Sequence, residues 1–265
     1  MYLSHFAMTR YPFGKDGAPE DLFKSEAFDE VTVRVKHLLD MRGIGLVTGE
    51  SGSGKTTSSR WLVSTLNTGL YRVVYVSLTT GNVMDLYKTI AWELGLAAER
   101  NRAALFRSIR SEVSRLCHEN RLRPVLIVDE AHHLRTDVLE DLRLLTNYAM
   151  DSENRLCILL IGHPELRRRL NMAALDALQQ RIVVRAHMRG LTRAETTAYV
   201  EHQLALAGCK HPVFEPAAIE AIYQATSGLP RRTNLLAHHA LLAAAIGKAN
   251  NVTAEHVQAA LIELG

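Results

Sequence analysis

Short runs of apolar residues recur along roughly the first 190 residues, and between them apolar and polar residues alternate with helical spacing. The runs are rich in valine, isoleucine and leucine, which is typical of strands buried on both faces of a parallel sheet. We therefore expect strands at residues 45–48, 71–78, 125–130, 156–163 and 181–187.

Amphipathic segments separate these strands, and turn formers such as Gly81-Asn82 and Pro124 bound several of them. Strands that alternate with helices in this way are typical of an α/β domain built on a parallel sheet. The predicted helices cover residues 20–40, 57–66, 83–94, 102–120, 137–150 and 174–180.

The alternation ends near residue 189, and helices alone follow. Thr192 and Glu195 form a capping box that opens one helix, Pro216 occupies the first turn of another, and Thr253 caps the last. We expect helices at 193–207, 217–226, 231–246 and after Thr253. The predicted organisation is an N-terminal arm at 1–20, an α/β domain at 21–189 and a small all-helical lid domain at 190–265.

The composition is that of a soluble globular protein, because 47% of the 265 residues are apolar and 22% are charged. No apolar run reaches the roughly 18 residues of a membrane span, and the first residues lack the pattern of a secretory signal. Cys117, Cys157 and Cys209 are scattered and odd in number, which suits a reducing compartment. We therefore expect a cytoplasmic protein with no membrane partner.

The net charge of +3 is modest, but arginines cluster at 100–123 and again at 167–193. Such clusters can contact a phosphate backbone or supply charged groups to a subunit interface. They can equally be solvated helix faces, so the sequence leaves both interpretations open.

The segment between the first strand and the next helix fits G-x-x-x-x-G-K-[ST], the phosphate-binding loop. Its glycines let the backbone approach an anion, so that N–H groups and the start of the helix point at the phosphates. We expect Lys55 to contact the β- and γ-phosphates and the Thr56 hydroxyl to bind Mg²⁺. A loop that merely caps a helix does not require this order of strand, loop, Lys-Thr and helix. The predicted nucleotide contacts are Gly49, Glu50, Ser51, Gly52, Ser53, Gly54, Lys55, Thr56 and Thr57.

The strand at 125–130 ends in two acidic residues, Asp129 and Glu130. A buried parallel strand of this kind delivers carboxylates to the edge of the sheet where ligands bind. We expect Asp129 to hold Mg²⁺ and Glu130 to orient or deprotonate the water that attacks the γ-phosphate. Alone, the pattern also fits a buried strand that ends in a polar turn; with the phosphate loop upstream it favours ATP hydrolysis.

Histidines follow two of the apolar strands. His132 and His133 complete the letters D-E-A-H, which also occur in nucleic-acid helicases, but those enzymes need a second motor domain for which this chain has no room. We expect no metal site at these histidines, because no further His or Cys lies nearby at ligand spacing. His163 is placed either to sense the γ-phosphate or to cap the following helix.

With these motifs in this order, the chain resembles an AAA+ ATPase over nearly its full length. Residues 49–56 match the Walker A motif, Asp129 and Glu130 match Walker B, and His163 falls at the sensor 1 position. Residues 228–231 look like the sensor 2 motif, which implies that Arg231 reaches the γ-phosphate from the lid. The resemblance also implies ATP and Mg²⁺ as cofactors and an ATPase activity.

More narrowly, several short motifs resemble the branch that contains ExeA/GspA secretion ATPases and TniB/TnsC regulators of transposition. The resemblance implies a homo-oligomer, either a ring or a helical filament, in which an arginine of one subunit acts on its neighbour's nucleotide. That position maps to Arg181, with Arg185 and Arg168 as alternatives. The motifs are Tyr-Pro-Phe at 11–13, the loop Gly-Glu-Ser-Gly-Ser-Gly-Lys-Thr-Thr, Asp-Glu-Ala-His, Ile-Gly-His-Pro-Glu-Leu and Gln-Gln-Arg-Ile.

The first function that this resemblance implies is regulation of DNA transposition. Such a protein assembles on double-stranded DNA when ATP is bound and presents that DNA to a transposase, alone or with a target-selection protein. DNA held mainly through its phosphates is bound without strong sequence preference. The candidate DNA contacts, chosen by position, are Thr79, Thr80, Arg100 and Arg102.

The second function is that of an ATPase assisting assembly of a secretion complex. Proteins of that kind carry a membrane span and a peptidoglycan-binding region, and neither occurs in this sequence, which favours the DNA function. A switch protein that binds ATP but hydrolyses it slowly is a third interpretation, against which the intact Glu130 argues.

Overall fold

The computed structural model describes residues 2–14, 18–77, 81–97, 99–209 and 211–265. The chain forms two compact units. The sheet unit consists of Phe28–Ser51 and Lys55–Met188, and the helical unit consists of Met1–Ala27, Gly52–Gly54 and Arg189–Gly265. The domain boundaries expected from the sequence stay a prediction.

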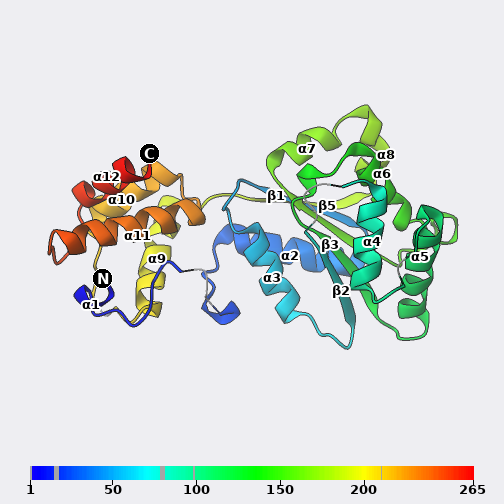
Figure 1. The fold of residues 1–265 in the computed structure, drawn as a ribbon, viewed down its shortest axis with the longest axis horizontal. Helices are drawn as coiled ribbons and strands as arrows, with labels where there is room; N and C mark the ends of the chain where they lie inside the picture. Colours follow the sequence, from blue (N-terminus) through cyan, green and yellow to red (C-terminus); the bar gives the residue numbers. More distant parts are fainter. Residues whose placement is uncertain (1, 15–17, 78–80, 98, 210) are drawn as a thin grey trace. The chain divides into compact units, whose positions relative to one another are not determined.

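The sheet unit is built on five parallel strands in the order β2-β3-β4-β1-β5 (Figure 1). This arrangement confirms the α/β fold with a parallel sheet, and it confirms that the strand ending near His163 lies beside the strand ending at Asp129. The strands are β1 Ile44–Gly49, β2 Tyr71–Val76, β3 Arg123–Val128, β4 Cys157–Gly162 and β5 Ile182–Met188.

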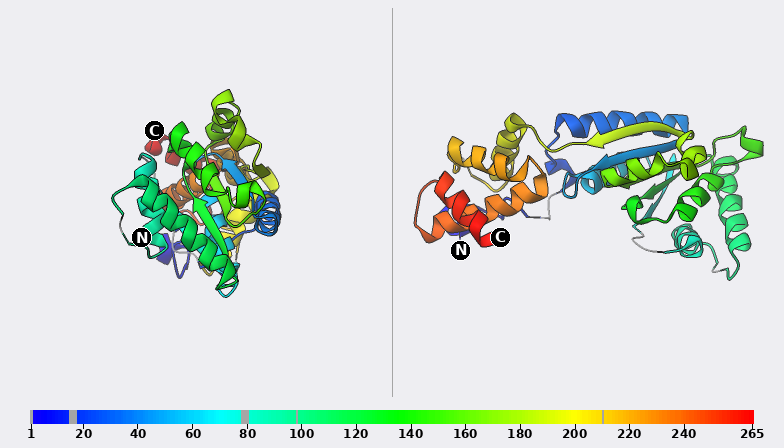
Figure 2. Two further views of the ribbon diagram at one scale, coloured as in Figure 1. Left: turned by 90° about the vertical axis from the view of Figure 1, so that its right-hand side faces the viewer. Right: turned by 90° about the horizontal axis from the view of Figure 1, so that it is seen from above.

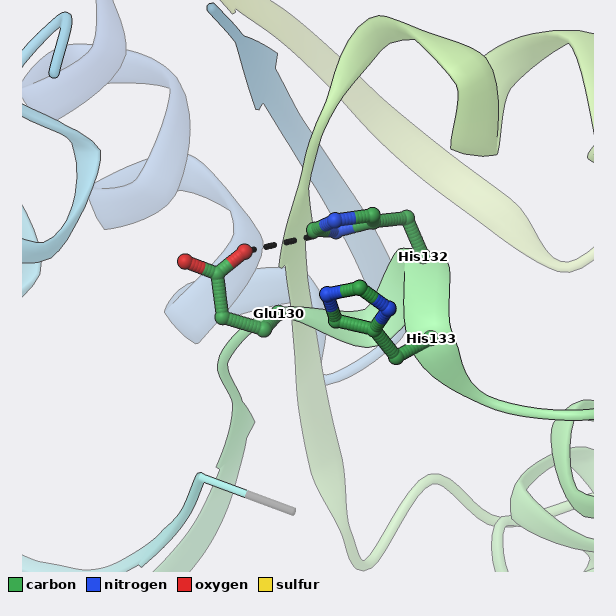
Figure 3. Close-up of side chains that lie close together, drawn as sticks. All are labelled: Glu130, His132 and His133. Atoms are coloured by element: carbon green, nitrogen blue, oxygen red, sulfur yellow. Dashed lines mark ion pairs between the residues drawn. The ribbon is translucent and has the colours of Figure 1, made fainter. Parts of the chain in front are cut away.

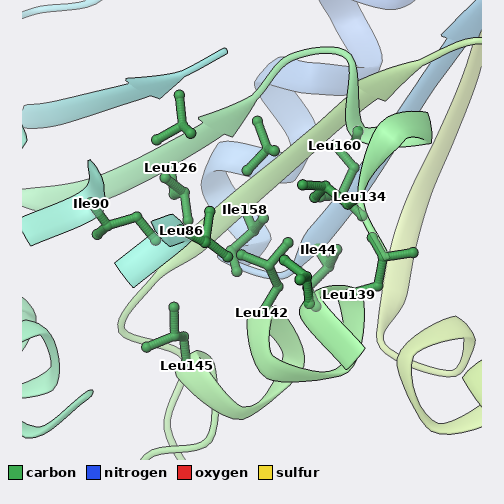
Figure 4. Close-up of a cluster of buried hydrophobic side chains, with 14 of the residues drawn as sticks. Ile44, Leu86, Ile90, Leu126, Leu134, Leu139, Leu142, Leu145, Ile158 and Leu160 are labelled. Atoms are coloured by element: carbon green, nitrogen blue, oxygen red, sulfur yellow. The ribbon is translucent and has the colours of Figure 1, made fainter. Parts of the chain in front are cut away.

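Strand position in the sheet explains the pattern of burial. Every residue of β1 and of β4 is buried, since both strands are interior and have helices over both faces, whereas β5 at the sheet edge alternates buried and exposed residues. Apolar side chains of several strands meet those of α4 and α6 in one cluster (Figure 4), in which Leu86, Leu126, Leu142 and Leu160 are almost fully buried.

Helices and short 3₁₀ turns connect the strands of the sheet unit. Gly45 permits one close contact, because a Cβ there would clash with Leu38 of α2. The elements are α2 Glu26–Met41, α3 Lys55–Thr65, α4 Val83–Glu93, α5 Arg102–His118, η2 Ala131–His133, α6 Thr136–Leu145, η3 Ala149–Asp151, α7 Pro164–Leu170, η4 Ala173–Leu175 and α8 Asp176–Gln179.

Two helix boundaries differ from expectation. The helix expected from residue 20 begins only at Glu26, since the chain is extended at Leu22 after the turn η1 at Pro19–Asp21. The helix expected over 137–150 ends at Leu145, and it does not resume because the backbone at 149–151 turns left-handed, with φ of 48°, 53° and 70°.

The helical unit joins the N-terminal arm to helices from the other end of the chain. Tyr2, Phe6 and Phe13 are buried in the same apolar cluster as residues of α9 to α12. The Tyr2 hydroxyl lies 2.9 Å from His238 Nδ1, and α1 contacts α11. Helices α11 and α12, drawn in orange and red, lie side by side (Figure 2). The elements are α1 Tyr2–His5, η1, α9 Arg193–Leu206, α10 Pro216–Thr226, α11 Pro230–Ile246 and α12 Ala254–Leu264.

The helix signals at 192 and 253 are confirmed. Thr192 and Glu195 form the expected capping box, and Thr253 caps α12 with His256. Among the described residues, none of the helices is both long enough and apolar enough to span a bilayer.

Candidate functional site

The phosphate loop joins β1 to α3 and has the backbone that its glycines predict. Gly52 and Gly54 have φ of +81° and +101°, which L side chains rarely adopt. Lys55 is the first residue of α3, and its buried ammonium donates hydrogen bonds to the carbonyls of Gly49, at 2.8 Å, and Glu50, at 2.9 Å. The loop thus curls around the amine that is expected to contact the phosphates.

Ser53 of this loop provides a test of whether an anion fits. Its side chain is buried, and its hydroxyl has no hydrogen-bond partner among the described residues. An unpaired buried hydroxyl costs about 1–3 kcal/mol. A phosphate oxygen at the loop would supply the missing acceptor, so the residues present fit a nucleotide.

Asp129, directly after β3, is buried, and both of its carboxylate oxygens accept hydrogen bonds. Its Oδ2 accepts from the Thr56 hydroxyl at 2.8 Å and from the Tyr75 hydroxyl at 2.9 Å, and its Oδ1 accepts from the Glu130 N–H at 2.8 Å. The structure therefore brings together the two predicted Mg²⁺ ligands, Thr56 and Asp129. A hydroxyl and a carboxylate oxygen are the donor types that Mg²⁺ takes, so the pair fits this ion.

Tyr75 was not expected at the site. Burial first, and the hydrogen bond to Asp129 second, raise the pKa of Tyr75 to about 12, so the phenol stays protonated and donates. The only signal in the sequence is its place in a strand. β2 pairs with β3 so that Tyr75 lies opposite Ile127, two residues before Asp129, and this pairing cannot be deduced from local pattern.

Glu130 sits in a left-handed backbone conformation, with φ 53° and ψ 33°. A non-glycine residue held there costs roughly 1–3 kcal/mol, and such strain gathers at functional sites. Its Oε2 lies 3.3 Å from His132 Nδ1, and Figure 3 shows both histidine rings beside the carboxylate. Burial, and then the neighbouring His133, lower the pKa of His132.

His163 follows β4 and precedes α7, where it is the N-cap residue without a side-chain capping bond. Its Nε2 lies 2.8 Å from Glu50 Oε2, and its N–H donates to His132 Nδ1 at 3.3 Å. The carboxyl ends of β1, β3 and β4 thus bring Glu50, His132 and His163 together. Arg169 stabilises the turn that leads from His132 to α6, because its guanidinium donates to the carbonyls of His132 and Leu134.

Two of the three candidate trans-acting arginines, Arg181 and Arg185, make contacts within their own subunit. Arg181, just before β5, donates to the Thr146 hydroxyl at 3.1 Å and pairs with Asp151 at 2.6 Å. Of the alternatives, Arg185 donates to the Gln179 carbonyl, and Arg168 is exposed on α7. In the helical unit, Arg231 lies in the first turn of α11, and its N–H donates to the Gly52 carbonyl at 3.2 Å.

The predicted DNA contacts fall in three different settings. Arg102 pairs with buried Asp141 through Nε and Nη2, at 2.6–3.1 Å, and the Tyr87 hydroxyl donates to the same carboxylate. Arg102 therefore ties α5 to α6. Arg100 is exposed, and Thr79 and Thr80 lie outside the described residues.

Comparison with known proteins shows which family the central part of the chain resembles. Residues 39–170 match the family described as an AAA domain. The chain is 37% identical over 247 residues to General secretion pathway protein A of Aeromonas hydrophila, a match that covers 92% of this chain and 45% of that protein. It is 25% identical over 146 residues to ATP-dependent target DNA activator B of Escherichia phage Mu, covering 55% of this chain and 43% of that protein. The chain thus spans less than half the length of these relatives.

Solved structures share the fold. Cdc6p from Pyrobaculum aerophilum has a TM-score of 0.72 at 16% identity, over 95% of this chain and 70% of that chain. A Drosophila ORC structure bound to DNA has a TM-score of 0.72 at 19% identity, over 99% of this chain and 65% of that chain. The RuvB branch migration motor of Thermotoga maritima has a TM-score of 0.57 at 17% identity, over 96% of this chain and 74% of that chain. The resemblance to AAA+ proteins of the secretion and transposition branch is confirmed.

Proposed function

Residues 39–170 of this chain form an AAA domain, and from this premise we propose that the protein is an ATPase whose site lies at the carboxyl ends of β1 and β3. One observation carries the proposal. The Thr56 hydroxyl and the Asp129 carboxylate meet at 2.8 Å at the end of the phosphate loop, although they lie 73 residues apart in the sequence.

Each residue of the site has a distinct task in this proposal. The N–H groups of the loop and Lys55 bind the β- and γ-phosphates, while Thr56 and Asp129 hold Mg²⁺. When bound, this ion neutralises phosphate charge. Glu130 accepts a proton from the water that attacks the γ-phosphorus, and His163 lies beside Glu50, where it can report the state of the loop.

Hydrolysis needs a further positive charge from outside the subunit. We assign this to Arg181, which gives up its contacts with Thr146 and Asp151 when it meets the nucleotide of a neighbouring subunit. Arg231 carries the sensor 2 role that the resemblance implies. ATP binding then promotes a homo-oligomer, and hydrolysis releases it.

The cellular role that we propose is regulation of DNA transposition in the cytoplasm. The match to a protein named ATP-dependent target DNA activator supports it, as does the arginine-rich stretch around α5. The protein assembles on double-stranded DNA with ATP bound and presents it to a transposase. Arg100, with Thr79 and Thr80, remains a proposed DNA contact, whereas the Arg102 guanidinium is held by Asp141.

A secretion role is the second candidate. The identity of 37% over 92% of this chain to General secretion pathway protein A favours it. In that case the ATPase works on a protein complex, and its arginine clusters contact protein partners.

DNA binding in different nucleotide states separates these candidates. Binding to duplex DNA and the size of the particles are measured with ATP and Mg²⁺, a non-hydrolysable analogue, ADP and no nucleotide, at two salt concentrations. The DNA role predicts rings or filaments only with the triphosphate, and their affinity falls as salt rises because phosphate contacts release counterions. The Lys55→Ala variant is the control and should not assemble. Nucleotide binding without DNA binding under any condition would reject the transposition role and favour secretion.

A further inference from the structure

Two histidines that the nucleotide site does not use lie beside the catalytic carboxylate of Glu130 and form a group with it. Each of Glu130, His132 and His133 offers a ligand atom, and these atoms all lie within 4.8 Å of one another (Figure 3). We propose that they form a second metal site, separate from the Mg²⁺ site, which takes a divalent transition ion such as Zn²⁺ and thereby withdraws Glu130 from hydrolysis.

The geometry suits an ion of this size. Zinc binds imidazole nitrogen and carboxylate oxygen at roughly 2.0–2.2 Å, which puts neighbouring ligands of a tetrahedral site about 3.3 Å apart. His132 Nδ1 and Glu130 Oε2 are 3.3 Å apart already. The His133 ring lies 4.0 Å from the His132 ring, centroid to centroid, so a rotation of this exposed side chain completes the set.

A second observation points to a missing cation. The N–H of His163 donates to His132 Nδ1, so this nitrogen presents a lone pair rather than a proton. The same nitrogen faces the Glu130 carboxylate, which is also an acceptor. Two acceptors thus face each other. Because the ring nitrogen has one lone pair, a cation bound by both groups displaces the 3.3 Å hydrogen bond from the His163 N–H and removes the repulsion.

The donor set selects the class of ion. Two imidazoles and one carboxylate suit zinc, nickel, cobalt or copper, whereas Mg²⁺ prefers six oxygen ligands. Mg²⁺ at Thr56 and Asp129 therefore does not compete for this group. Three protein ligands leave a position open for water, and the 44% exposed Glu130 side chain gives the ion access from solvent.

The spacing of histidines and cysteines does not predict this site, because its third ligand is a glutamate. The left-handed backbone at Glu130 turns its carboxylate back toward the two residues that follow it. In that conformation a side chain already assigned to catalysis becomes the third ligand. The regulatory half of the inference rests on the proposed ATPase function, whereas ion binding itself does not.

Ion binding is tested without reference to catalysis. Wild type, His133→Ala and His37→Ala are titrated with Co²⁺, whose visible absorption reports ligand geometry, and with Zn²⁺ in competition with a chromophoric chelator. His37 is an exposed histidine on α2 and serves as the matched control. We expect one ion per chain for wild type and His37→Ala, and at least a tenfold weaker affinity for His133→Ala. Equal affinity of all three proteins would overturn the site.

The effect on hydrolysis is measured as a ratio within each variant. Phosphate release is recorded at saturating ATP and excess Mg²⁺, with and without Zn²⁺. Wild type and His37→Ala should lose at least tenfold in rate when the ion is added, and His133→Ala should lose far less. Equal inhibition of all three would overturn the regulatory half. Ion binding by a chain that hydrolyses no ATP under any condition would support the metal site and reject the proposed ATPase.

Discussion

The two units of this protein differ in the kind of polar group that they bury. Among the described residues, the buried charged side chains are Lys55, Asp129 and Asp141, and all three belong to the sheet unit. In the helical unit the buried polar side chains are uncharged, and Thr226, for example, is satisfied by the Ile222 carbonyl within its own helix. Burying a charged side chain costs several kcal/mol unless the charge is paired. The positions of buried charges therefore indicate where side chains have a role besides packing.

The partners of a buried carboxylate distinguish a residue of the nucleotide site from a residue that only stabilises the fold. Asp141 accepts hydrogen bonds from Arg102 and Tyr87, so its charge is paired in contacts that join α4, α5 and α6. Asp129 has no cationic partner among these contacts: it accepts from two hydroxyls and from the Glu130 N–H, and an incoming cation can displace or share the hydroxyls. Buried carboxylates of similar exposure thus have different roles in the same unit.

The largest effect is expected from loss of the catalytic carboxylate. Glu130→Gln keeps the shape of the side chain but cannot accept a proton, so turnover should fall by about 10²–10⁴-fold while ATP still binds. Phosphate release and nucleotide affinity are measured in parallel. Turnover equal to that of wild type would remove Glu130 from the mechanism.

Core substitutions should affect the two units separately. Leu142→Ala in the sheet unit and Leu241→Ala in the helical unit each remove a fully buried side chain, at a cost of about 2–5 kcal/mol in unfolding free energy. Chemical unfolding gives the cost, and hydrogen exchange shows where it falls. We expect faster exchange in the sheet for Leu142→Ala and in α9 to α12 for Leu241→Ala. The same exchange pattern for both variants would contradict the division into two units.

Substitutions at Arg102 and at Arg100 should have different effects, because we expect the first arginine to stabilise the fold and the second to contact DNA. Arg102→Ala leaves Asp141 buried without its cation, so the unfolding free energy should fall by about 1–3 kcal/mol. Arg100→Ala should leave it unchanged within about 0.5 kcal/mol. Urea unfolding and DNA affinity are measured for both. A weaker DNA affinity for Arg100→Ala alone would identify the exposed arginine as the contact, whereas an unchanged stability of Arg102→Ala would contradict the role given to Asp141.

The smallest effect is expected at Tyr75. Tyr75→Phe deletes one hydrogen bond to Asp129 but leaves those from Thr56 and the Glu130 N–H, so Mg²⁺-dependent ATP affinity should change by about 0.5–1.5 kcal/mol. Nucleotide titrations at several Mg²⁺ concentrations detect it. A loss as large as that of Glu130→Gln would mean that Tyr75 takes part in the reaction itself.

The sequence predicted the elements of the sheet unit well because strand burial and helix periodicity are local. The phosphate loop, β3 with its terminal acids, and β4 all follow from runs of a few residues. The break after Leu145 escaped prediction, since apolar residues at 148–150 continue the pattern past the point where the helix ends.

Contacts between distant residues could not be predicted in the same way. The pairing of Arg102 with Asp141 and that of Tyr75 with Asp129 depend on which strands and helices are neighbours. The sheet order β2-β3-β4-β1-β5 differs from the chain order, so the residues that meet at its edge come from separated segments. Periodicity reports the burial of each element but not this order.

Nucleotide binding tests the central claim most directly. A fluorescent ATP analogue is titrated, with Mg²⁺ present, into wild type and into Lys55→Ala. Lys55 is the charged group around which the loop carbonyls of Gly49 and Glu50 close. We predict saturable binding to wild type and an affinity roughly 10- to 100-fold lower for the variant, because charged hydrogen bonds contribute about 1.5–3 kcal/mol. The same affinity in both proteins would contradict the assignment of the loop as the ATP site.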